Sequence, residues 1–225
     1  MEHNKKYVDS FKYGLLFGKQ VEPGKEVSIS VTDKKDILLA IKKAYIDMSP
    51  RTFESADSED KRAISYKGKT DLFDALADKF LEYINNGSSD FDKWHNEICV
   101  YFIKKLKELL RDAGKQEGQA TYGKAQTIIN MTFKYLYCYD DAAEHIEKFE
   151  PCHMALDSYI LNWYREKYNE NNDKHLTKTG KNRLPVWSNL DYEQYISIQK
   201  NIRGYCERIP IEEEFLIWYQ QKESK

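Results

Sequence analysis

The chain has 225 residues, a formal net charge of −2 at pH 7, and 32% charged residues. No apolar run approaches the roughly 20 residues that cross a bilayer, and the first residues lack the apolar centre of a secretory signal. We therefore expect a cytoplasmic protein with no membrane partner. The near-neutral balance excludes a globally basic nucleic-acid binder, although it leaves room for a local basic face.

The first 48 residues predict two helices separated by an extended segment. Residues 5–17 have helical spacing, with an expected apolar face of Tyr7, Val8, Phe11, Leu15 and Leu16. Residues 19–32 combine a Pro23-Gly24 turn signal with alternating Val27, Ile29 and Val31, which predicts one short β-hairpin. Thr32 or Asp33 then caps a helix that extends to about Met48.

The next hundred residues predict one loop and two long helices. Residues 49–68 are polar with few apolar anchors, and we expect them to form a mobile loop. Thr70 opens a helix that ends at Asn85-Asn86-Gly87, and residues 90–113 form the longest helix, with Ser89 and Asp92 as its capping pair.

Residues 121–168 predict the central helix pair of the protein. The first helix starts at Thr121 or Gly123 and is apolar on nearly all sides, which is typical of a helix contacted from several directions. The second begins near Asp157, and two further helices, 191–206 and 211–221, end the chain. The sequence thus predicts a mostly α, single globular domain over residues 1–225 with seven to nine helices.

Lys124 and Asp157 are the first candidates for chemistry. An amine attacks when it is deprotonated, and a carboxylate at a helix start is held ionised by backbone N–H groups. Each residue also has a structural reading, because Lys124 in a first helical turn is commonly a solvated charge and Asp157 is most simply an N-cap. The residues alone leave both readings open.

Two short motifs carry a family resemblance. Residues 127–134, TIINMTFK, and residues 153–161, HMALDSYIL, resemble the helix and Asp loop of the helix-hairpin-helix DNA glycosylases, in particular the archaeal oxoguanine glycosylase branch. The resemblance implies an all-helical protein that binds double-stranded DNA, flips a damaged base and attacks the sugar with a Lys while an Asp assists. The same stretch also resembles a family of uncharacterised prokaryotic helical proteins.

Only one of the two catalytic residues of the glycosylase family has a counterpart at the matching position of this chain. Asp157 matches the assisting Asp, whereas Thr127 stands where the register puts the nucleophilic Lys. Lys124 lies one turn earlier and Lys134 two turns later, and Lys124 is our candidate amine. The resemblance thus implies a DNA N-glycosylase, with or without lyase activity.

Two other groups of residues are candidates for ligand binding. The polar loop that follows the central pair carries Lys174, Lys178, Lys181 and Arg183, which we predict to contact DNA phosphates, with a solvated loop as the plainer alternative. Cys138, His145, Cys152 and His153 are ligand types, but their spacing lacks the close pairs of structural zinc sites. We therefore predict no metal and no cofactor.

Two functions follow from these observations. The first is a glycosylase-like protein that recognises or excises a base in DNA. The alternative is a non-enzymatic helical binding or interaction protein, of a defence type, whose central helices serve only as core. The sequence leaves the substrate base and the oligomeric state open.

Overall fold

The computed structural model describes residues 5–20, 22, 25–48, 64–173 and 175–223 of the chain, and these residues form nine α-helices and no strand. The predicted mostly α fold is therefore confirmed. The helices are α1 (Lys5–Phe17), α2 (Lys34–Asp47), α3 (Tyr66–Asn86), α4 (Phe91–Asp112), α5 (Tyr122–Leu136), α6 (Ile146–Phe149), α7 (Ser158–Asn171), α8 (Tyr192–Tyr205) and α9 (Pro210–Glu223). Three short 3-10 turns, η2 (Glu117–Gln119), η3 (Ala142–His145) and η4 (Trp187–Asn189), lie between them.

Polar side chains set most of the helix starts. Asp33 caps α2, Thr121 caps α5, and Asp191 forms a capping box with Gln194 at the start of α8. Each of these side chains accepts a backbone N–H that the helix itself leaves unpaired. For α4 the predicted Ser89 cap is wrong by one position, because Asp90 accepts the N–H of Lys93 instead.

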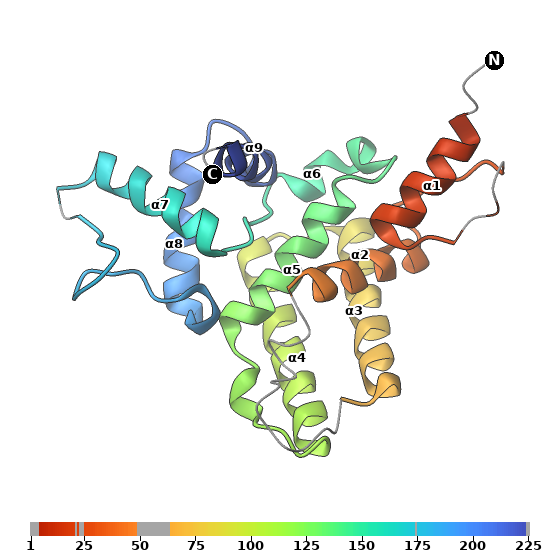
Figure 1. Cartoon of the computed structure of the whole chain (residues 1–225), viewed down its shortest axis with the longest axis horizontal. Coiled ribbons are helices and arrows are strands. Elements are labelled where there is room, and N and C mark those ends of the chain that lie inside the picture. Colours follow the sequence, from red (N-terminus) through yellow and green to blue (C-terminus); the bar gives the residue numbers. More distant parts are fainter. Residues whose placement is uncertain (1–4, 21, 23–24, 49–63, 174, 224–225) are drawn as a thin grey trace.

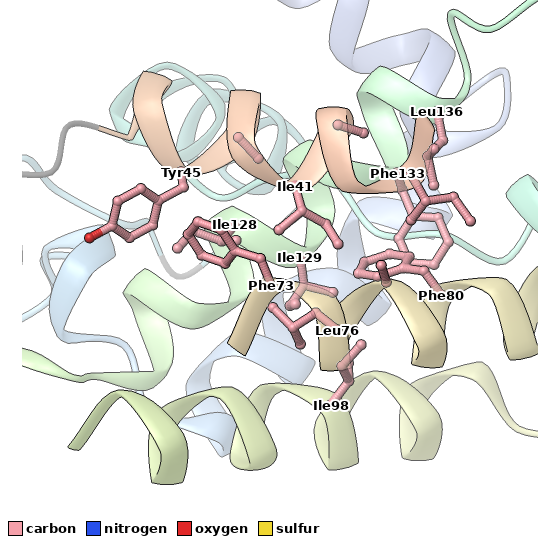
Figure 2. Packing of buried hydrophobic residues seen from close by; sticks show 14 of the residues in the cluster. Ile41, Tyr45, Phe73, Leu76, Phe80, Ile98, Ile128, Ile129, Phe133 and Leu136 are labelled. Atoms are coloured by element: carbon pink, nitrogen blue, oxygen red, sulfur yellow. The ribbon is translucent and has the colours of Figure 1, made fainter. Parts of the chain in front are cut away.

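Helix α5 lies at the centre of the molecule, between α2, α3 and α4 on one side and α7, α8 and α9 on the other (Figure 1). Its apolar side chains meet those of α2, α3 and α4 in the larger of two hydrophobic clusters (Figure 2). Five α5 side chains in this cluster are fully buried: Ala125, Ile128, Ile129, Phe133 and Leu136.

A second hydrophobic cluster unites α7, α8 and α9 around the fully buried Tyr195. Tyr122 and Trp187 pack against both clusters and so connect them. The two helices of the predicted central pair therefore belong to different clusters. The buried segment 152–156 leads from one cluster to the other and ends at Asp157.

The predicted β-hairpin in residues 19–32 is wrong for the described part of that range. Ile29 and Val31 are fully buried, as their alternation predicts, but their backbone N–H groups donate to the carboxylates of Asp140 and Asp141, each at 2.9 Å. Side chains from the α5–η3 connection thus take the place of a neighbouring strand.

The apolar face predicted for α1 is also wrong. Phe11 and Leu15 are 71% and 70% exposed, and Val8 and Leu16 are exposed as well. The buried face carries Tyr13 and Phe17 instead, because the Tyr13 hydroxyl donates to Asp140 at 2.5 Å and Phe17 packs edge-on against Tyr139.

Residues 49–63 of the predicted mobile loop 49–68 lie outside the described residues. Its last residues are not a loop, because Ser65 caps α3 through the N–H of Gly68 and Tyr66 begins the helix. The predicted start at Thr70 is therefore one turn too late.

Candidate functional site

A pocket of about 510 Å³, which we call the Asp157 pocket, opens between α5, α7, α9 and the C-terminal end of α2. Aromatic side chains form much of its wall, namely Tyr135, Tyr159, Trp187 and Trp218. Its charged groups are three carboxylates and one ammonium among the described residues that line it, from Asp47, Asp157, Glu214 and Lys134. Concave apolar walls with a few converging polar groups are typical of a ligand site, and this size lies within the usual range.

Asp157 occupies the start of α7 at the wall of this pocket. Its Oδ1 accepts the N–H groups of Tyr159 at 2.8 Å and Ile160 at 2.9 Å, so the predicted N-cap is confirmed. Burial raises the pKa of this carboxyl group, while the two N–H groups, the nearby Lys134 ammonium and the Trp218 side chain act in the opposite direction. The result is a carboxylate that is largely withdrawn from water and still borders open space.

Lys134 and Glu214 form a buried ion pair beside Asp157. Their Nζ and Oε1 atoms are 2.7 Å apart, and the side chains are 14% and 2% exposed. The N–H of Ala155 donates to the other Glu214 oxygen at 3.0 Å, and the Lys134 ammonium lies 5.2 Å from the ring centroids of Phe215 and Trp218. Burial raises the pKa of Glu214. An ammonium held in this way has no lone pair for nucleophilic attack.

Lys124, the candidate amine, does not line the pocket. Its side chain is mostly buried in the first turn of α5, and Nζ donates to the Gln119 side chain at 3.0 Å. Burial lowers its pKa. The plainer reading of Lys124 as a solvated charge is therefore wrong. The structure also does not join Lys124 to Asp157 in this pocket, where the lining residues from α5 are Thr127, Met131, Lys134 and Tyr135.

Three of the four predicted phosphate-contacting residues lie on a short turn. Lys178, Lys181 and Arg183 are exposed there, whereas Lys174 is outside the described residues. The turn closes through the N–H of Thr177, which donates to the Asn182 carbonyl at 3.1 Å. Gly180 has a φ of 87°, a conformation that side chains other than glycine rarely adopt.

This turn borders a second hollow, which we call the α7 groove. It measures about 350 Å³ and is lined by Arg165, Lys178 and residues 184–187, among others. Ser158 and Trp187 line both the α7 groove and the Asp157 pocket, so the two hollows adjoin. Of the predicted basic residues that the structure describes, Lys178 lines the α7 groove, whereas Lys181 and Arg183 are not among its lining residues.

A buried polar network supports the segment that carries Asp157, and sequence reasoning missed it. His153 accepts a hydrogen bond from the Tyr195 hydroxyl at 2.8 Å and donates to Asp92 at 2.9 Å. Asn130 on α5 joins His95 at 2.9 Å and Tyr195 at 2.8 Å. Asn130 in a helix predicted to be buried on nearly all sides is the sequence signal, because a buried amide needs hydrogen-bonding partners.

The protonation state of this network follows from its burial. Burial lowers the pKa of both histidines, and the hydrogen bond with His153 lowers that of Asp92 to about 2. At neutral pH the network therefore combines two neutral imidazoles with one carboxylate, which also accepts from Arg203 at 3.0 Å. Such a network fixes the orientation of the segment before Asp157.

The residues considered for a metal site do not assemble. His153 belongs to the buried network, Cys152 is buried with its thiol on the Lys148 carbonyl, and Cys138 is exposed. In the part of the chain that the structure describes, no group of three or more His, Cys, Asp or Glu side chains is arranged to hold a metal ion.

Comparison with protein-family models, with curated proteins and with solved structures finds no match to this chain. The resemblance to the glycosylase superfamily therefore stays a prediction. No helix within the described residues is long and apolar enough to cross a membrane.

Proposed function

We propose that this protein recognises or excises a base in DNA, with the Asp157 pocket as the site that receives the base. The observation that carries the proposal is the position of the Asp157 carboxylate, at the start of α7 and on the wall of a 510 Å³ pocket with aromatic sides. Enzymes that act on a base take it out of the helical stack and hold it between aromatic side chains.

The role of Asp157 in excision would be electrostatic. When the bond between the sugar and the base breaks, the base leaves with the electron pair, and positive charge develops on the sugar. A fixed carboxylate beside the sugar stabilises that charge. Water then adds to the sugar, and the proton that this water loses neutralises the departed base. Removing one such preorganised group typically slows a reaction by about 10²–10³-fold.

A hydrolytic reaction fits the pocket better than an amine-dependent one. Lys134 is the amine in the pocket wall, and it is ion-paired with Glu214 at 2.7 Å. Lys124 has a lowered pKa but does not line the pocket. We therefore expect base release without a covalent intermediate between the enzyme and the sugar.

A panel of duplex oligonucleotides, each with one damaged or mismatched base, tests this proposal. Base release is detected as alkali-induced strand cleavage, and borohydride is added in parallel to trap any Schiff base. We expect release from at least one duplex, loss of release in Asp157→Asn, and no trapped adduct. A trapped adduct that disappears in Lys124→Ala would contradict the hydrolytic reading, and no release from any duplex would contradict excision.

Asp157→Asn is an informative variant because Asn caps a helix about as well as Asp. The matched control is Asp191→Asn, which makes the same change at the start of α8, outside the pocket. Since burial raises the pKa of Asp157 in the folded protein, its charge is destabilising there, and we expect Asp157→Asn to unfold at an equal or higher urea concentration than the wild type.

One observation favours the alternative, a non-enzymatic interaction protein. The exposed face of α1 presents Val8, Phe11, Leu15 and Leu16 to solvent. Contiguous apolar side chains of this kind mark interaction surfaces in soluble proteins. Sedimentation velocity over a range of concentrations tests self-association through this face. Association in the wild type that is lost in Phe11→Lys would support this function, and a monomer at every concentration would contradict self-association.

A further inference from the structure

The charged side chains that line the two adjoining hollows differ in net sign. The Asp157 pocket contains three carboxylates and one ammonium among the described residues that line it, and that ammonium is already paired with Glu214. The α7 groove contains a guanidinium and an ammonium, from Arg165 and Lys178, and no carboxylate among its described lining residues. A ligand that extends across both hollows would meet an anion-repelling pocket at one end and an anion-attracting groove at the other.

Arg165 is the better-placed of the two groove cations. Its side chain is only 13% exposed, and its Nη1 donates to the Asn162 side chain at 2.8 Å, which holds the guanidinium along α7. The nearest carboxylate oxygen in the described residues is that of Glu166, 4.0 Å from Nη2, beyond hydrogen-bond distance. A guanidinium has five N–H donors in a planar fork, and such a fork fits two oxygens of a phosphate.

The junction between the hollows suits a sugar or the edge of a base. Ser158 is exposed and offers a hydroxyl, and Trp187 offers a ring that borders both spaces. Gly123 keeps η4 against α5, because a Cβ there would lie 2.0 Å from the Trp187 carbonyl oxygen. The N–H of Gly123 also donates to the Leu190 carbonyl at 3.1 Å, so the backbone that carries Trp187 is held at both ends of η4.

We propose that the pocket and the α7 groove form one nucleotide site, in which the base enters the Asp157 pocket and a phosphate attached to the same nucleotide lies against Arg165 and Lys178. This inference rests on the proposed function for the base end of the site. It adds that a phosphate is required for binding and that Arg165, absent from the sequence predictions, holds it. The phosphate belongs either to a nucleic acid strand or to a free nucleotide.

Binding measurements with matched probes test the nucleotide site. The probes are deoxyadenosine, deoxyadenosine monophosphate and a single-stranded pentanucleotide, measured by calorimetry at low and moderate salt. We expect a phosphate-bearing probe to bind at least about tenfold more tightly than the nucleoside, with salt dependence. Preference for the pentanucleotide assigns the phosphate to a strand, and preference for the monophosphate assigns it to a free nucleotide.

The variants separate this inference from folding defects. Arg165→Gln should reduce the affinity for the phosphate-bearing probes about tenfold and leave the nucleoside unchanged, and Arg165→Lys should recover part of the loss. Lys178→Gln changes an exposed side chain and should weaken the same probes about threefold. Lys200→Gln removes an exposed charge on α8 that lines neither hollow and should have no effect.

The outcomes distinguish the two proposals. If Arg165→Gln and Lys178→Gln bind every probe as the wild type does, the nucleotide site is wrong. Base excision that requires Asp157 but is indifferent to Arg165 would keep the proposed function and overturn this inference. Phosphate-dependent binding that requires Arg165, without excision from any duplex, would keep the nucleotide site and overturn excision.

Discussion

Asn130→Ala should destabilise the protein strongly, because Asn130 is the α5 member of the buried polar network. The side chain is 1% exposed. Its Oδ1 accepts from His95 at 2.9 Å, and its Nδ2 donates to three oxygens, those of Tyr195 at 2.8 Å, Gln126 at 3.0 Å and Met154 at 3.1 Å. The substitution removes all four contacts and leaves a small cavity.

The size of the effect depends on the hydrogen bonds that the groups in contact with Asn130 retain after the substitution. After the substitution every neighbour retains at least one other hydrogen bond: His95 with Tyr195, Tyr195 with His153, Gln126 with Leu156, and the Met154 carbonyl with Gln199. No group becomes an unpaired buried polar group, so the cost is the loss of the bonds themselves, each about 1 kcal/mol. Since Nδ2 shares two hydrogens among three acceptors, we expect the lost hydrogen bonds to cost about 3 kcal/mol, to which the small cavity adds.

Urea unfolding at pH 7.5, followed by circular dichroism, measures this loss. The control is Asn201→Ala on α8, a half-buried amide with one hydrogen bond to Tyr164 at 2.9 Å, which should cost about 1 kcal/mol or less. An Asn130→Ala variant within about 1 kcal/mol of the wild type would refute the reasoning, because the network would then contribute no more than one ordinary hydrogen bond.

Three further changes test other parts of the structure. Lowering the pH from 7.5 to 5 should reduce the free energy of unfolding, because burial lowers the pKa of His95 and His153 in the folded protein. The contribution of the two neutral histidines to stability is fully present above the pKa of an unfolded histidine, about 6.5, and is lost as the pH falls below it. Lys134→Met should cost about 3–5 kcal/mol at neutral pH, because Glu214 would remain buried without its counter-ion. Gly123→Ala should cost about 1–3 kcal/mol, because its Cβ would lie 2.0 Å from a backbone oxygen of η4.

Each of these changes has a control. A free energy of unfolding that stays constant between pH 7.5 and 5 would contradict the conclusion that His95 and His153 are neutral in the folded protein. The control is replacement of the exposed His175, which should leave the pH dependence of stability unchanged. Adding Glu214→Gln to Lys134→Met should recover most of the loss, since no uncompensated charge remains. Gly204→Ala on α8 has no atom within 4 Å of the new Cβ and should leave stability unchanged or raise it by up to about 1 kcal/mol.

Local signals were sufficient for most of the helices. The spacing of apolar residues predicts α2, α4, α8 and α9, and the N-cap is one of the two readings that the sequence offers for Asp157. These features depend on residues that are close in sequence. For α1 the same kind of signal indicates the wrong face, because two faces of the helix carry large apolar side chains. Only tertiary contacts, of Tyr13 with Asp140 and of Phe17 with Tyr139, select the buried face.

The missing parts of the site depend on contacts between distant residues. Glu214 belongs to an acidic run at a helix start, which local reasoning explains by the helix dipole, yet it is buried against Lys134, 80 residues earlier. Arg165 likewise gives no signal of its own in the sequence, since only the fold places the 177–187 segment beside α7. Spacing along the chain contains no information on such pairs.

The central claim, that the Asp157 carboxylate acts on a base-bearing sugar, is tested most directly by single-turnover base release. The measurement compares Asp157→Asn with Asp191→Asn and the wild type on the best duplex of the panel, under conditions where all three are folded. We predict that Asp157→Asn is slower by at least about 100-fold while Asp191→Asn matches the wild type. Equal rates in all three proteins would contradict the claim.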